Sequence, residues 1–120
     1  MQQGLIDLHT HSTCSDGSMT PAELVKHAAQ NGLAAIALTD HDTVSGVEEA
    51  VEAGERYGIE VVPAIEFSVK SKTETHILGY FIDIHNPDLK EILSEIIEKR
   101  IERNVMTAQL LKDLGFDVTL

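Results

Sequence analysis

The chain has 120 residues, a length that fits one domain, and its 20 acidic and 9 basic side chains give a net charge of −11. This acidity argues against a broad cationic surface for nucleic acid or anionic lipid, although bound metal ions would give an anionic substrate a local positive site. Without an apolar run of about 18 residues or a basic start, we expect neither a membrane span nor a signal peptide. The single cysteine, Cys14, favours a reducing, cytoplasmic setting.

The first third of the chain predicts a strand, a loop, a helix and a second strand. The apolar run Leu5–Leu8 indicates the first strand, and the polar residues 10–19 indicate a loop. Thr20-Pro21-Ala22-Glu23 then combines a helix cap, a proline at the first helical position and a capping box, and the helix it opens ends near Gly32. The continuous apolar run 33–38 is typical of a strand covered on both faces.

The remaining elements continue this alternation. Ser45-Gly46-Val47-Glu48 forms a second capping box, which predicts a helix to about Tyr57. Residues 59–69 and 75–82 predict two further strands. Asn86-Pro87 starts a long helix whose apolar stripe continues to about Leu114. The order of strands and helices indicates an α/β fold with parallel neighbouring strands.

A pair of histidines, His9 and His11, follows the first predicted strand. Residues two apart in an extended segment point the same way, so both imidazoles can reach one metal ion. Two surface loop histidines are the alternative, but the carboxyl end of a parallel strand is where α/β folds place their sites. Asp16, five residues beyond His11, taken alone is better explained as a turn aspartate before Gly17.

Further candidate ligands follow the later strands. His41 lies between Asp40 and Asp42, which favours a ligand with supporting carboxylates; we expect Asp40 to orient a ligand or bind metal itself. Glu66 interrupts an apolar run, where an unpaired charge is costly, so a cation is the obvious partner. His76 lies on a strand, and a hydrogen-bonded core histidine is equally compatible with its position. The repetition of such residues at successive strand ends predicts a metal site.

Other polar residues fit simpler explanations. His27 lies within a helix and His85 in a loop. A thiolate ligand at Cys14 would be out of character with a nitrogen and oxygen donor set. From the residues alone, Arg100 and Arg103 are better explained as solvated charges on the long helix.

The motifs together resemble the PHP (polymerase and histidinol phosphatase) family, most closely its small stand-alone phosphoesterases acting on nucleotides or short RNA. The resemblance covers essentially the whole chain. It rests on five segments in order: Asp7-Leu8-His9-Thr10-His11-Ser12, Ser15-Asp16-Gly17, Thr39-Asp40-His41-Asp42, Ala64-Ile65-Glu66-Phe67-Ser68 and His76-Ile77-Leu78-Gly79-Tyr80.

The resemblance implies the N-terminal part of a distorted (β/α)7 barrel with a three-metal site. Residues 1–85 would form this part of the barrel, residues 86–120 would be a long helix opening a helical insertion, and the C-terminal part of the barrel would be absent. The family's later ligands, a further histidine and an Asp-x-His pair, would lie beyond Leu120. A closed α/β barrel needs about 250 residues, so we expect this chain to be part of a larger fold.

The resemblance also implies a distribution of ligands over three divalent ions, which the ligand chemistry allows to be Zn, Mn or Fe. His9, His11 and Glu66 would hold the first ion, Glu66 and His76 a second, and Asp16 and His41 a third. Many family members carry histidine at the position of Asp16, whereas the nucleotidase-like branch has aspartate. Arg100 and Arg103 match a recurring Arg-x-x-Arg pattern, which implies contact with a substrate phosphate.

The resulting hypothesis is metal-dependent phosphoester hydrolysis by a metal-bridging hydroxide, with Glu66, His76 and Asp40 as catalytic residues. The expected substrate is a phosphorylated small molecule or short nucleic acid, most simply a nucleotide or oligonucleotide phosphodiester. A histidinol-phosphate-type phosphomonoesterase, an amidohydrolase and a non-catalytic PHP structural module are the alternatives. The apolar stripe of the long helix is expected to be core, and an exposed stripe would permit a homodimer.

Overall fold

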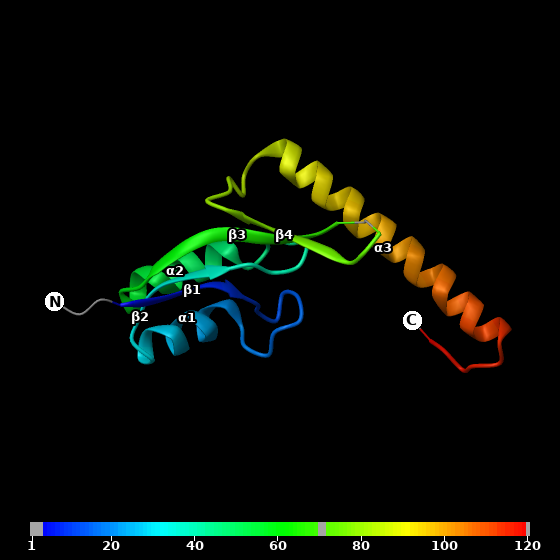
Figure 1. The fold of residues 1–120 in the computed structure, drawn as a ribbon, viewed down its shortest axis with the longest axis horizontal. Coiled ribbons are helices and arrows are strands. Elements are labelled where there is room, and N and C mark those ends of the chain that lie inside the picture. The colour runs from blue at the N-terminus through cyan, green and yellow to red at the C-terminus, as the bar shows by residue number, and fades with distance from the viewer. Residues whose placement is uncertain (1–3, 70–71, 120) are drawn as a thin grey trace. The chain divides into compact units, whose positions relative to one another are not determined.

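The computed structural model describes residues 4–69 and 72–119. The elements, shown in Figure 1, follow in the order β1 (Leu5–Thr10), α1 (Pro21–Gln30), β2 (Leu33–Leu38), α2 (Val47–Tyr57), β3 (Glu60–Val69), β4 (Thr75–Tyr80) and α3 (Pro87–Asp113). The chain divides into two compact units, Met1–Ile84 with the sheet and two helices, and His85–Leu120 with α3.

The four strands form one sheet in the order β1-β2-β3-β4. β1, β2 and β3 are parallel, which confirms the α/β prediction, and β4 returns antiparallel to β3. The hydroxyl of Tyr80 on β4 donates a hydrogen bond to the carbonyl of Leu8 on β1 at 2.6 Å. Three strand spacings would separate β1 from β4 by roughly 14 Å in a flat sheet, beyond the reach of a tyrosine side chain. The sheet is therefore strongly curved.

Helices α1 and α2 pack against each other and cover one face of the sheet. The core beneath them brings together one buried stripe from each helix and the alternate residues of β2 that face them. Its buried members are Val25, Ala28, Ile36, Leu38, Ala50, Ala53 and Ile59. Because successive residues of a strand point to opposite faces, this packing fixes which residues point away from the helices.

The face of the sheet away from these helices carries small buried residues. Ala37, Val62 and Ala64 form a separate apolar cluster there. Glu66 continues the row of Val62 and Ala64, because alternate residues of β3 share a face. The register of the strands thus directs Glu66 away from the helices, above a surface built of short side chains.

Three local predictions need correction. The strand predicted at Leu5–Leu8 continues through His9 to Thr10, and the strand predicted to reach Ile82 ends at Tyr80. The predicted cap of α2 at Ser45 is wrong, because the helix begins after Gly46 without a side-chain cap. The Ser45 hydroxyl instead accepts a hydrogen bond from the Thr43 hydroxyl at 3.1 Å.

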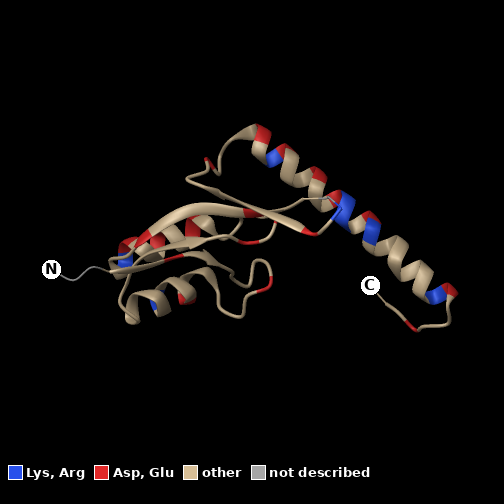
Figure 2. Cartoon of the chain, in the orientation of Figure 1, with Lys and Arg blue, Asp and Glu red and all other residues tan. Residues whose placement is uncertain are grey.

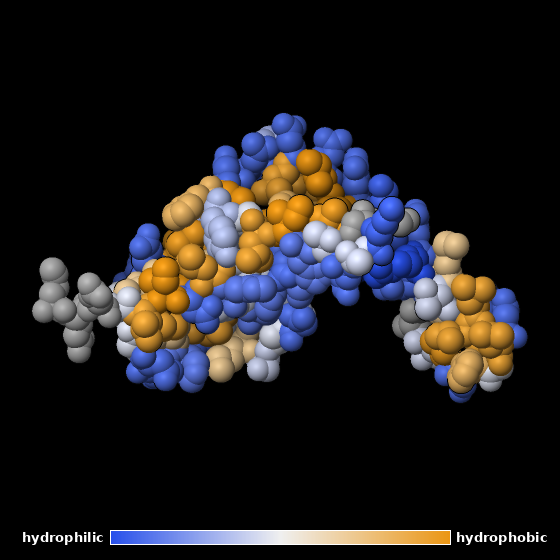
Figure 3. All heavy atoms as spheres, viewed as in Figure 1, coloured by the Kyte–Doolittle hydropathy of each residue, from blue (hydrophilic) through white to orange (hydrophobic). Residues whose placement is uncertain are grey.

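The second unit is the single helix α3, which begins at the predicted Asn86 cap and ends before Gly115. The basic residues of the chain concentrate on this helix, as Figure 2 shows. Leu93 and Ala108 are buried, but much of the predicted core stripe is not: Ile97, Ile101 and Val105 remain about half exposed. Figure 3 shows apolar atoms gathered at the C-terminal end of α3. A dimer through this surface remains a prediction.

Within the described residues, no helix has the length and apolarity needed to cross a membrane.

The two predicted capping boxes, at Thr20 and Ser45, provide a matched stability test. The Thr20 hydroxyl accepts the Glu23 amide hydrogen at 3.2 Å and the Glu23 carboxylate accepts the Thr20 amide hydrogen at 3.0 Å. Thr20→Ala should lower the free energy of unfolding by about 1 kcal/mol, as is typical of a lost cap. Ser45→Ala, at the position that does not cap, should change it by less than about 0.5 kcal/mol. Urea unfolding of both variants measures the difference; equal effects would contradict these cap assignments.

Candidate metal centre

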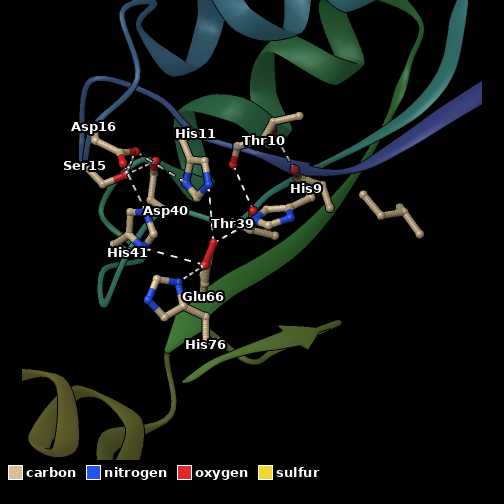
Figure 4. Close-up of polar contacts among 12 residues, drawn as sticks. His9, Thr10, His11, Ser15, Asp16, Thr39, Asp40, His41, Glu66 and His76 are labelled. Atoms are coloured by element: carbon tan, nitrogen blue, oxygen red, sulfur yellow. Dashed lines mark hydrogen bonds and ion pairs between the residues drawn. The ribbon is translucent and has the colours of Figure 1, made fainter. Parts of the chain in front are cut away.

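The centre of the candidate site is the carboxylate of Glu66, which is only 2% exposed. Its backbone is fixed on one side by the segment that follows β2: the Glu66 amide donates to the Asp40 carbonyl at 3.1 Å, and the Asp42 amide donates to the Glu66 carbonyl at 2.9 Å. Burying a carboxylate requires compensating partners. The structure supplies four imidazoles around it, as Figure 4 shows.

Two of these imidazoles reach Glu66 through strand pairing. His76 on β4 lies opposite Ser68 on β3, so it is a diagonal neighbour of Glu66 on the same face. Its Nδ1 lies 2.6 Å from Glu66 Oε2. His41 forms an isolated parallel bridge with Glu66, and its Nδ1 lies 3.8 Å from the same oxygen. Both histidines therefore face Oε2.

The other two imidazoles come from the end of β1 and face the second oxygen. His9 Nε2 lies 2.7 Å from Glu66 Oε1, and His11 Nε2 lies 3.3 Å from the same atom. The two rings meet edge to face, with centroids 5.1 Å apart. The predicted reach of His9 and His11 to one point is thus present, and each carboxylate oxygen of Glu66 has its own pair of histidines.

A second carboxylate, Asp16, lies on the outer side of the cluster. His41 Nε2 is 3.1 Å from Asp16 Oδ2, and His11 Nδ1 is 3.7 Å from Asp16 Oδ1. The His11 and His41 rings stack with centroids 4.5 Å apart. Each of these two imidazoles therefore turns one nitrogen toward Glu66 and the other toward Asp16.

The donor set fits divalent metal ions. Three groups of residues each bring ligand atoms within 4.8 Å of one another: His9, His11 and Glu66; His11, Asp16 and His41; and His41, Glu66 and His76. Within the part of the chain that the structure describes, His11 Nδ1 is the buried side-chain polar atom that lacks a hydrogen-bond partner. A metal ion between His11 and Asp16 would satisfy it, and imidazole with carboxylate is a ligand set that suits Zn, Mn or Fe.

The mutual contacts shift two pKa values. Burial raises the pKa of Glu66, but hydrogen bonds from His9 and His76 and the positive charge of His41 outweigh burial and lower it below 4.5. The hydrogen bond to Glu66 raises the pKa of His76 above 6.5, against the opposing effect of burial, and Glu74 adds to the rise. The cluster therefore favours an ionised carboxylate, which is the form that binds metal.

Asp40, predicted to be catalytic or to orient a ligand, is buried beside the cluster but belongs to none of the three groups. Its two oxygens accept hydrogen bonds from Ser12 and Ser15. These contacts favour an orienting role. Ser12 and Ser15 were missed in the sequence, since serines in a polar loop give no pattern that separates them from ordinary turn residues.

The remaining candidates lie elsewhere. Arg100 and Arg103 are on α3, in the second unit, so their predicted phosphate contact stays a prediction. His27 is exposed on α1, where it lies near Asn31, and Cys14 is exposed in the loop before α1. Asp42 is buried with a φ of 52° and accepts the Ser68 amide hydrogen at 3.0 Å, so it fastens β3 as well as the local turn.

Several known proteins resemble this chain in sequence and in fold. The PHP domain family matches residues 7–112. The chain is 46% identical over 99 residues to a 3′,5′-nucleoside bisphosphate phosphatase from Chromobacterium violaceum, covering 82% of this chain and 35% of that protein. It is 38% identical over 111 residues to the 5′-3′ exoribonuclease Rnm of Escherichia coli, covering 90% and 38%. A solved structure from Bifidobacterium adolescentis, assigned as a metal-dependent phosphoesterase, superposes with a TM-score of 0.85 at 30% identity, covering 98% and 41%.

The chain therefore belongs to the PHP domain family, and the sequence-based assignment is confirmed. The match includes every candidate metal ligand, because all of them lie between residues 7 and 112. The chain spans about two fifths or less of the length of these relatives.

The two shifted pKa values predict how the metal-free protein responds to pH. The lowered pKa of Glu66 stabilises the fold above pH 4.5, and this contribution is lost as pH falls through the folded-state pKa. The raised pKa of His76 stabilises it below pH 6.5, and this contribution is lost as pH rises through the folded-state pKa. The stabilisation from Glu66 and His76 together should be fully present between pH 4.5 and pH 6.5.

Unfolding measured against pH in the presence of a chelator tests this window. Glu66→Gln should flatten both flanks, because it removes the carboxylate that both shifts depend on. Glu74→Gln is the matched control, since Glu74 contacts only the outer nitrogen of His76 at 3.3 Å, and it should leave the acidic flank unchanged. An unaltered pH profile in Glu66→Gln would contradict the electrostatic account.

Proposed function

We propose that this protein is a metal-dependent phosphoesterase that hydrolyses phosphate esters of nucleotides or short oligonucleotides. The observation that carries the proposal is the buried carboxylate of Glu66, with two histidine nitrogens directed at each of its oxygens. A carboxylate with this surrounding has the connectivity of a ligand shared by two ions. Within the chain as described, the sheet would be the first part of the distorted (β/α)7 barrel that the sequence motifs imply.

The contacts support a distribution of three ions. His9, His11 and Glu66 would hold the first ion, and Glu66 with His76 and His41 the second. Asp16 with His41 and His11 would hold the third. His11 and His41 each appear in two groups because both of their nitrogens face a carboxylate. The further ligands that complete the coordination of each ion would decide which nitrogen of His11 and of His41 binds which ion.

Divalent ions bound at this site would lower the pKa of water toward about 7, supply the bridging hydroxide as nucleophile and neutralise the charge of a phosphate. The chain's own residues prepare for this chemistry. The pKa of Glu66 is lowered, which favours the ionised carboxylate, and both its amide and its carbonyl are hydrogen-bonded to residues 40–42, so its position is fixed before the substrate arrives. His41 and His76 line the cluster on the side of Glu66 Oε2.

The substrate class is drawn from the relatives and from charge. One relative is named as a nucleoside bisphosphate phosphatase and another as an exoribonuclease, so both phosphomonoesters and phosphodiesters of nucleotides are candidates. The net charge of −11 disfavours long nucleic acid and favours a small substrate bound at the metal centre. Arg100 and Arg103, one helical turn apart on α3, are proposed to contact a substrate phosphate.

Glu66→Gln tests the proposal in the full protein loaded with metal. Loss of a shared ligand should cost more than the 10–100-fold typical of an outer-shell change, so phosphate release should fall by at least about a hundredfold. Elemental analysis should show fewer bound ions per chain. His27→Gln is the control, because His27 is exposed on α1 outside the cluster. It should retain both activity and metal.

A substrate panel separates the candidate activities. A 3′,5′-nucleoside bisphosphate, a short oligoribonucleotide and histidinol phosphate would distinguish a nucleotide phosphatase, a diesterase and a histidinol-phosphate-type enzyme. A protein that binds its ions but releases phosphate from none of these would contradict the proposed activity. A protein that binds no ions would instead favour a non-catalytic structural module.

A further inference from the structure

A buried hydrogen-bond network lies directly beside the imidazole cluster. Asp40 Oδ1 accepts the Ser12 amide hydrogen and the Ser15 hydroxyl hydrogen, each at 2.7 Å, and Asp40 Oδ2 accepts the Ser12 hydroxyl hydrogen at 2.6 Å. Ser12 is 0% and Asp40 1% exposed. Charge-assisted bonds of this length in a buried setting are strong and geometrically restrictive.

Each member of the network is the chain neighbour of one candidate metal ligand. Ser12 follows His11, Ser15 precedes Asp16, and Asp40 precedes His41. His11, Asp16 and His41 are the three members of the outer group. The network therefore connects the backbones of all three residues of that group, which come from two separate segments of the chain.

The loop after β1 is folded tightly around Ser12. The Ser12 carbonyl accepts the amide hydrogens of Ser15 at 3.1 Å and of Gly17 at 2.8 Å. A Cβ at position 17 would collide with the carbonyl of His11, so glycine is needed for this approach. The loop thereby brings Asp16 back to His41, although the Asp16 side chain is 65% exposed.

The other two groups have a different support. Both contain Glu66, whose position follows from the pairing of β3 with β4 and with residues 40–42. His76 meets Glu66 because it is a diagonal neighbour across that pairing. Asp16, by contrast, belongs to no strand, and its placement depends on the loop that Asp40 fastens.

We propose that Asp40 is a positioning residue that, through Ser12 and Ser15, holds the loop carrying Asp16 and thereby sets the geometry of the ion that Asp16 would share with His11 and His41. The effect is selective for that ion because Asp16 belongs to this group alone, whereas His11 and His41 also belong to the groups that Glu66 supports. This inference rests on the proposed metal-dependent function. Of the roles expected for Asp40, orienting a ligand, binding metal itself or acting in catalysis, it selects the first and specifies the loop through which Asp40 acts, and it assigns roles to Ser12 and Ser15. Residues that orient ligands in this way commonly change metal affinity by about 10–100-fold.

Ser15→Ala in the full protein tests the loop, because it removes one half-buried hydroxyl, which lies 2.7 Å from Asp40 Oδ1 and 3.5 Å from Asp16 Oδ1, and leaves the Ser12 contacts to Asp40 intact. Asp40→Asn leaves that hydroxyl beside Asp16 and so separates the Asp40 bond from the direct contact with Asp16. Titration of the chelator-treated protein with Mn²⁺ or Zn²⁺ should show one ion weakened by about 10–100-fold and the other ions unchanged. Asp40→Asn should weaken the same ion further, since an amide cannot accept hydrogen bonds at both positions. Ser45→Ala, the same change in a neighbouring loop, is the matched control and should bind all ions normally.

The outcomes separate this inference from the function on which it rests. Ser15→Ala and Asp40→Asn with every ion at unchanged affinity would overturn the positioning role while leaving the metal centre intact. Equal weakening of all ions in Ser15→Ala, with helical content retained by circular dichroism, would also overturn it, because the effect would not be selective. An unaltered protein that binds no ion would overturn the proposed function itself. If Asp40→Asn does not fold, Ser12→Ala takes its place, because it removes the hydroxyl bond to Asp40 Oδ2 and leaves the Ser15 hydroxyl in position; unchanged affinity for every ion in Ser12→Ala and Ser15→Ala would overturn the positioning role.

Discussion

The burial of the Glu66 carboxylate is the constraint on which the rest of the site depends. An ionised carboxylate at 2% exposure is tolerated only with close partners, and here the partners are four imidazoles from three different segments. Those segments are the end of β1, the turn after β2 and the start of β4. Their convergence requires the curved sheet, which the Tyr80 hydroxyl spans from β4 to β1. The curvature of the sheet and the convergence of the candidate ligands therefore depend on each other.

Two kinds of support hold the ligands around Glu66. Strand pairing fixes Glu66, His41 and His76, since backbone hydrogen bonds and the alternation of a strand decide where these side chains point. A loop fixes Asp16, and its support is the buried hydrogen bonding between Asp40 and the two serines. The positions of Glu66, His41 and His76, which strand pairing sets, would be difficult to shift by a single substitution elsewhere in the strands. The loop part, which has no strand pairing to support it, is more easily altered.

The sequence predicted the features that depend on residues close together in the chain. Apolar runs and helix signals located the strands and helices, and the family motifs identified six candidate ligands, which the structure brings into one cluster. It failed where a residue's partner is distant in the chain. Ser45 had the pattern of a cap, yet the capping position is the next residue, Gly46, where Pro21 and Cys14 crowd any added side chain. The partners of Asp40 lie 25 and 28 residues away, and no periodicity marks such a pair. The predicted ligand roles stay predictions until an ion is observed.

Anomalous X-ray diffraction from crystals of the full protein grown with Mn²⁺ or Zn²⁺ tests the central claim most directly. If Glu66 is the shared ligand, one anomalous peak should lie beside its Oε1, within coordination distance of His9 and His11. A second should lie beside its Oε2, within coordination distance of His76. Peaks confined to other parts of the molecule, with the Glu66 carboxylate bonded only to histidines, would contradict the account.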